Sequence, residues 1–110
     1  MRKNAAKLSE RETALYVSTF RAKPGYDRML LVELQRLVRN TRRESECLFC
    51  DLYRLSVDPT VFSIHSVWTS QDNWLNSGGW KNHPAGIGLL DLCLSEPIEI
   101  VTMEEVPEAA

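Results

Sequence analysis

The pattern of hydrophobic and polar positions predicts four strands after residue 12. Each segment is short, is rich in β-branched, aromatic and aliphatic residues, and is bounded by Pro, Gly, Asp or Ser, as strands commonly are. The expected strands are residues 13–20, 47–55, 61–68 and 97–106. The link between the second and third strands contains Asp58-Pro59, which suits a hairpin, so these two strands should pair antiparallel.

Two helical patterns lie between these strands. The first follows Pro24-Gly25, and its apolar residues recur every three to four positions, which places them on one buried side of a helix. These residues are Leu30, Leu34, Leu37, Val38 and Thr41. The second pattern is less regular, because Ser70 can cap one short helix and Pro84 permits a new start. The helix that begins after Pro84 has an apolar side formed by Ile87, Leu90 and Leu94.

The order strand, helix, strand, strand, helix, strand is that of the ferredoxin-like split βαβ fold. This is an α+β architecture with both helices on one face of a four-stranded antiparallel sheet. The strands are nevertheless apolar on both faces, since Cys50 and Leu52 alternate with Phe49 and Tyr53. Two helices can cover only one face. We therefore expect the same face of a second copy to cover the other, which gives a homodimer and a cavity bounded by strands and helices.

Composition and charge leave small molecules and other proteins as the expected binding partners. The chain has 110 residues, which fits one domain at residues 13–106, with a flexible N-terminal arm at 1–12 and a tail at 107–110. A net charge of −2 gives no basic surface for nucleic acid or an anionic membrane. No apolar run reaches the length of a membrane span, and the polar start lacks a signal peptide, so we expect a cytoplasmic protein.

Three cysteines, Cys47, Cys50 and Cys93, make an odd count that argues against a closed disulfide framework and fits a reducing compartment. The spacing Cys47-x-x-Cys50 resembles half of a zinc or redox motif, but it lies within an expected strand and no second pair completes four ligands. We interpret both residues as buried strand thiols and expect no metal.

Four sequence segments carry a family resemblance. They are "AKPGYD" after the first strand, "ESECLFCDLYR", "DPTVFSIHSVW" and "HP" in the second helical region. Over about residues 13–106 the chain resembles the antibiotic biosynthesis monooxygenase (ABM) family, and this implies a dimeric α+β barrel. The resemblance further implies a monooxygenase, an oxidoreductase that uses O₂ on a small quinol-like or polycyclic phenolic compound and needs no cofactor.

The resemblance also implies site residues. Trp68 falls on the aromatic that usually ends the third strand and borders the pocket, and His83 falls near the histidine of the second helical region. We expect catalytic roles for both, with His83 as a base, because imidazole accepts a proton near neutrality. The expected substrate contacts are Phe62, Ile64, Ser66, Trp80, Asn82 and His65. Strand alternation puts His65 on the face opposite Trp68, so both can line one pocket only across a bulge.

Other functions stay open at this point. The family commonly has a carboxylate where Ser66 stands, and relatives usually show the reverse order of His83 and its proline. Both departures favour a non-catalytic homodimer that binds a small apolar ligand or takes part in assembly. A third possibility is an isomerase of a small phosphorylated metabolite. Such an enzyme would need basic residues in its pocket, and the sequence does not allow us to locate any. Haem cleavage is disfavoured, since the first strand offers Ser18 or Thr19 where the haem-degrading relatives have Asn.

Overall fold

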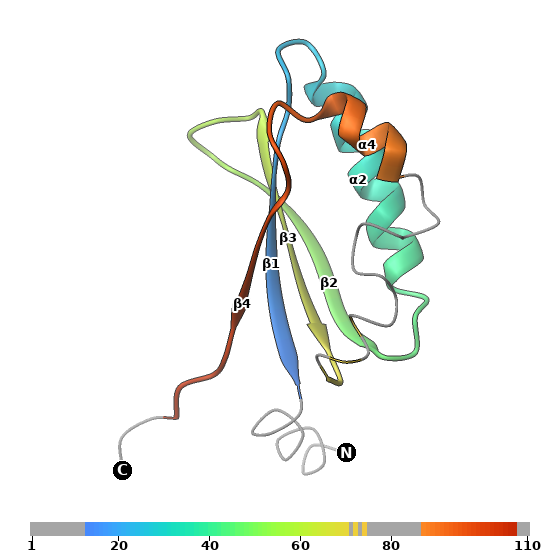
Figure 1. Cartoon of the computed structure of the whole chain (residues 1–110), viewed down its shortest axis with the longest axis vertical. Helices are drawn as coiled ribbons and strands as arrows, with labels where there is room; N and C mark the ends of the chain where they lie inside the picture. Colours follow the sequence, from blue (N-terminus) through green and yellow to red (C-terminus); the bar gives the residue numbers. More distant parts are fainter. Residues whose placement is uncertain (1–12, 71, 73, 75–86, 108–110) are drawn as a thin grey trace.

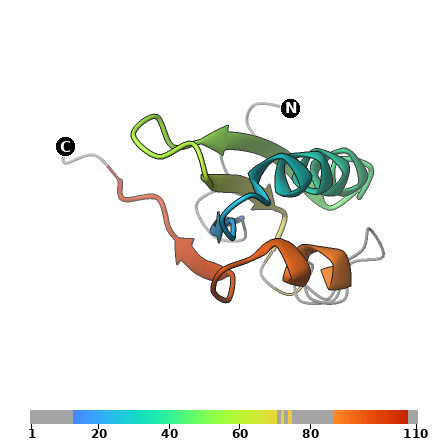
Figure 2. The same ribbon diagram turned by 90° about the horizontal axis from the view of Figure 1, so that it is seen from above.

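The computed structural model describes residues 13–70, 72, 74 and 87–107. These residues form one antiparallel sheet of four strands in the order β2-β3-β1-β4. Both helices lie on the same side of the sheet, as Figures 1 and 2 show. The elements are β1 (Ala14–Arg21), α2 (Asp27–Thr41), β2 (Cys47–Arg54), β3 (Val61–Trp68), α4 (Ile87–Cys93) and β4 (Glu99–Met103). The predicted ferredoxin-like α+β fold is therefore confirmed.

Helix α2 buries the side that its apolar spacing predicts. All five predicted side chains are buried, and Glu33 is buried with them. Thr41 is accommodated among the leucines because its hydroxyl donates a hydrogen bond of 2.7 Å to the carbonyl oxygen of Leu37. The turn before the helix needs glycine, since Gly25 has a φ of +85°.

The two helices divide the sheet between them. In Figure 2, α2 lies over the half of the sheet that contains β2, and α4 lies over the half that contains β4. Backbone hydrogen bonds of 2.8 Å join Lys23 N to Cys93 O and Ser95 N to Arg21 O, so the end of α4 is tied to the end of β1. Among the described residues, neither helix is long and apolar enough to cross a membrane.

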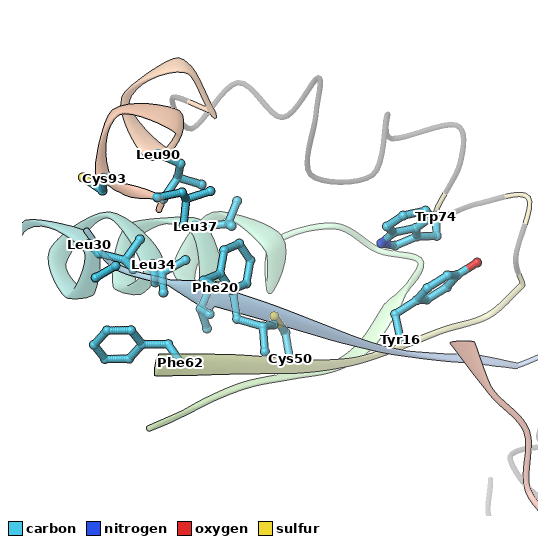
Figure 3. Packing of buried hydrophobic residues seen from close by; sticks show 14 of the residues in the cluster. Tyr16, Phe20, Leu30, Leu34, Leu37, Cys50, Phe62, Trp74, Leu90 and Cys93 are labelled. Carbon is cyan, nitrogen blue, oxygen red and sulfur yellow. The ribbon is translucent and has the colours of Figure 1, made fainter. Parts of the chain in front are cut away.

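The core fills the space between the helices and the sheet. Its central part is a close-packed group of large apolar side chains from both layers (Figure 3). This group includes Phe20, Leu30, Leu34, Leu37, Phe62 and Leu90. Burying these side chains away from water supplies the main driving force that holds the helices on this face.

The opposite face of the sheet carries apolar side chains across all four strands. Antiparallel partners on neighbouring strands point to the same face, so the strand pairing defines rows of side chains. We use the name apolar row for the row formed by Phe49, Val67, Leu15 and Met103. Phe49 is 65 % exposed, which confirms that the helices leave this face uncovered. An apolar row of this length favours burial against another surface.

The hairpin between β2 and β3 is closed by Asp58, in the predicted linker. Its Oδ1 atom accepts hydrogen bonds from the backbone nitrogen of Thr60 at 3.1 Å and from the Thr60 hydroxyl at 2.7 Å. The Thr60 side chain, followed by its backbone N–H, lowers the pKa of Asp58 below its ordinary value of 3.8. The carboxylate form is thus favoured in the folded state.

Replacement of this carboxylate, Asp58→Ala, is expected to lower the melting temperature at neutral pH. A group whose pKa is depressed by folding stabilises the fold above its unfolded pKa, and this contribution is lost as the pH falls through the folded pKa. The difference in melting temperature between wild type and Asp58→Ala, measured by circular dichroism, should therefore shrink as the pH falls below 3.8. An equal difference at pH 2 and pH 7 would contradict the role assigned to the charge.

Candidate functional site

One row on the helix-facing side of the sheet carries a hydroxyl or thiol group on every strand. The register places Ser66 of β3 between Tyr16 of β1 and Cys50 of β2, and places Tyr16 opposite Thr102 of β4. We call these four residues the polar row. The next row along the sheet contains Ile64 and Ser18, and Tyr16 and Cys50 of the polar row belong to the hydrophobic core. The polar row thus extends from the core to the exposed Thr102 on the edge strand β4.

Three hydrogen-bonding groups in and beside this row are buried. Ser66 is fully buried and Tyr16 is 2 % exposed, and Trp68, two positions after Ser66 on the same face, is buried as well. Tyr16 Oη, Ser66 Oγ and Trp68 Nε1 have no hydrogen-bond partner among the described residues. A buried polar group left without a partner costs about 1–3 kcal/mol. Three such groups together indicate a candidate binding site, in which further polar atoms can form hydrogen bonds with them.

Tyr16 of the polar row belongs to an aromatic pair. The Tyr16 ring stacks on the Trp74 ring, with centroids 4.1 Å apart and planes inclined by 15°. Figure 3 shows this pair set apart from the apolar group around Phe20 and Leu37. Aromatic faces and hydroxyl donors therefore occur side by side at this end of the sheet, which is the chemistry that a flat, oxygen-bearing molecule needs.

The charge state of Tyr16 follows from its surroundings. Burial, and after it the negative charge of Asp72, raises the pKa of the Tyr16 phenol above its ordinary value of 10.0. Both causes disfavour the anion. The phenol is therefore protonated at neutral pH and is able to donate a hydrogen bond.

The structure brings together the predicted wall residues of β3. All four are buried on the helix-facing side, and they are Phe62, Ile64, Ser66 and Trp68. The other predicted contacts, Trp80 and Asn82, and the predicted base, His83, lie outside the described residues.

His65 does not join this wall. It is exposed on the opposite face of the sheet, where its ring lies 4.8 Å from that of Tyr53. A shared wall would have required a bulge in β3, but β3 pairs with β1 without a register shift from Val61 to Trp68. The sheet therefore separates His65 from Trp68, and we remove His65 from the candidate site.

Tyr16 and Trp74 were not among the predicted site residues. Alternation along β1 does place Tyr16 with Ser18 and Phe20, so its face could be read from the sequence. Its position opposite Ser66 depends on the strand register, which local sequence does not specify. Among the described residues, no three His, Cys, Asp or Glu side chains are grouped as metal ligands would be.

A separate groove of about 520 Å³ lies between α2 and the edge strand β2. Its lining comprises Gln35, Val38, Arg39, Arg42, Asp51, Leu52 and Tyr53. Arg42 is held there by Asp51 at 3.1 Å and by the carbonyl oxygen of Cys50 at 2.8 Å. None of the predicted site residues lines this groove.

Solved structures share the fold at low sequence identity. A conserved protein from Methanosarcina mazei superposes with a TM-score of 0.79 at 19% identity, over 92% of this chain and 99% of that one. A protein from Pseudomonas aeruginosa gives a TM-score of 0.76 at 23% identity, over 89% and 98%. A structure described as an antibiotic biosynthesis monooxygenase gives 0.71 at 23% identity, over 86% and 99%.

Comparison at the level of sequence identifies the family. No functionally curated protein matches the chain. The sequence profile of the antibiotic biosynthesis monooxygenases does match it, over residues 15–85, which include α2, β2, β3 and all of β1 except Ala14. That match covers well over half of the chain and contains three residues of the polar row, Tyr16, Cys50 and Ser66. The chain belongs to the antibiotic biosynthesis monooxygenase family.

Proposed function

We propose that this protein is a cofactor-independent monooxygenase that oxidises a small quinol-like or polycyclic phenolic compound with O₂. The observation that carries the proposal is the set of buried donors at Tyr16, Ser66 and Trp68, which have no partner among the described residues. Neutral donors beside aromatic faces suit a flat ring with oxygen substituents. Membership of the ABM family supports the same class of reaction.

The proposed reaction depends on the electron richness of the substrate. Once ionised, the phenol passes an electron to O₂, and recombination of the two radicals forms the new C–O bond. The substrate loses two hydrogen atoms and gains one oxygen atom, and the second oxygen atom leaves as water. The protein has to bind the ring, remove a proton and exclude bulk water.

Each residue of the site has a distinct proposed role. Trp68 donates to a substrate oxygen as it gains negative charge, since N–H groups bond anionic oxygens more strongly than neutral ones. His83 is the proposed base, and Trp80 and Asn82 are proposed substrate contacts beside it. The apolar side chains proposed to hold the ring are Phe62 and Ile64.

The proposal includes a homodimer in the cytoplasm. The exposed apolar row supports the dimer, because an isologous interface would cover the same row on both copies. Burial of the apolar row in the dimer would also keep the sheet rigid behind the polar row. A cytoplasmic location is supported by three cysteines that are all free.

A test of the proposal measures O₂ consumption with a panel of hydroquinones and anthrols. Tyr16→Phe removes only a hydroxyl, and Trp68→Phe removes the indole N–H donor together with part of the ring system. Each is expected to lower kcat/KM by about 10- to 100-fold, the effect of losing a hydrogen bond to a charged group. Tyr26→Phe is the matched control, since it removes a hydroxyl from an exposed tyrosine and should leave the rate unchanged.

A second candidate function is a non-catalytic dimer that binds a small aromatic ligand. Ser66 favours it, because this neutral hydroxyl stands where the ABM pattern commonly has a carboxylate. Titration of tryptophan fluorescence with the same panel separates the two functions. Binding that Tyr16→Phe weakens, without O₂ consumption by wild type, would favour the second candidate and overturn the first.

A further inference from the structure

One extra residue in β2 brings two cysteines to the same face of the sheet. Cys47 pairs with Trp68 and Cys50 with Ser66, and Leu48 is the bulged residue between them that has no partner in the register. Residues three apart in a regular strand point to opposite faces, but a bulge reverses this relation. Because Trp68 and Ser66 share the helix-facing side, their partners Cys47 and Cys50 share it too.

The bulge also shortens the spacing of the two cysteines. Their partners on β3, Trp68 and Ser66, are two strand positions apart, or about 6.6 Å between Cα atoms, and the extra residue in β2 draws Cys47 and Cys50 toward that spacing. A disulfide joins Cα atoms that are about 4.4–6.8 Å apart. The Cys47 thiol donates a hydrogen bond of 3.3 Å to the backbone oxygen of Phe49, the residue next to Cys50, so its sulfur lies on the side of β2 toward Cys50. A disulfide between Cys47 and Cys50 therefore requires only that β2 adjusts locally at its bulge.

The two thiols differ in access and in acidity. Cys47 is partly exposed, whereas Cys50 is buried. The Cys50 thiol, the Phe49 backbone and the charge of Arg42 lower the pKa of Cys47, against the opposing effects of burial and Glu44. The neighbouring Cys47 thiol, and after it burial, raises the pKa of Cys50. One thiol is therefore accessible and prone to ionise, and its neighbour is sheltered and protonated, as in pairs of attacking and resolving cysteines.

We propose that Cys47 and Cys50 form a thiol site that reduces hydroperoxides and closes to an intramolecular disulfide. The Cys47 thiolate attacks the O–O bond, so that Cys47 becomes a sulfenic acid and the hydroperoxide leaves as an alcohol or, from hydrogen peroxide, as water. The Cys50 sulfur then attacks the Cys47 sulfur, so that the S–S bond forms and the S–O bond breaks, and the Cys50 proton joins the leaving hydroxyl as water. In total two thiols give up two electrons and two protons, and one hydroperoxide becomes one alcohol and one water.

A disulfide between Cys47 and Cys50 would change the surroundings of the polar row. Cys50 is the strand partner of Ser66, and Cys47 is the strand partner of Trp68. Joining the two sulfur atoms would therefore shift side chains next to both Ser66 and Trp68. This inference does not depend on the proposed monooxygenase activity, because the thiol chemistry can be measured without an organic substrate.

The test treats the reduced full-length protein with hydrogen peroxide and maps its thiols by alkylation and mass spectrometry. Two of the three thiols should be lost, with a Cys47–Cys50 link in the digest, and dithiothreitol should restore them. Cys50→Ser and Cys50→Ala should instead accumulate a sulfenic acid at Cys47 that dimedone traps. Cys47→Ser should abolish the reaction.

Cys93 provides the matched control. It is also buried, and burial raises its pKa, with the charge of Glu33 as the next cause, so it should not react. Cys93→Ser is therefore expected to form the same disulfide as wild type. Three free thiols after peroxide treatment, or links only between different chains, would overturn the proposal. So would alkylation of Cys47 in the native protein that is no faster than that of free cysteine.

Discussion

Phe49→Asp is expected to convert the proposed homodimer into a folded monomer. In a two-fold interface the substitution places a carboxylate in the apolar row of each copy, where the facing surface is the same apolar row. An unpaired charge buried in this way costs about 3–5 kcal/mol, so the dissociation constant should rise by roughly 100- to 1,000-fold or more. Sedimentation velocity at micromolar concentration measures this change.

The fold of the single copy should survive the change. Phe49 is largely exposed in the protomer, so the circular dichroism spectrum should match that of wild type. Val57→Asp is the control, because Val57 is an apolar residue in the β2–β3 hairpin that is 89 % exposed and lies outside the apolar row. It should leave the dimer intact. A wild-type chain that sediments as a monomer would remove the basis for the proposed dimer.

The helix and the strand faces could be predicted because each depends on local periodicity. The leucines of α2 recur at helical spacing, and they are the residues that the structure buries. The alternation of β3 likewise separates Trp68 from His65 without any knowledge of the neighbouring strands. Alternation predicts that His65 lies on the face opposite Trp68, as the structure shows. Its assignment to the pocket would have required a bulge in β3, and β3 pairs with β1 without one.

The site itself depends on register, which local sequence does not determine. Tyr16 and Ser66 are 50 positions apart in the sequence, and only the pairing of β1 with β3 puts them in one row. The bulge at Leu48 is a second example. Simple alternation places Cys47 and Cys50 on opposite faces, so the sequence supported an interpretation as two unrelated buried thiols. The extra residue makes them neighbours, and Cys47 is partly exposed.

Leu34→Ala is expected to lower the free energy of unfolding by about 2–5 kcal/mol. Leu34 is fully buried in α2, where its side chain lies in the core that supports the sheet below the polar row (Figure 3). Its truncation removes apolar contacts and leaves a cavity that the surrounding side chains fill only in part. Val32→Ala on the exposed side of the same helix is the control, with an expected change within about 0.5 kcal/mol. Urea unfolding at one fixed protein concentration measures both, and equal effects of the two substitutions would contradict the assignment of the buried face of α2.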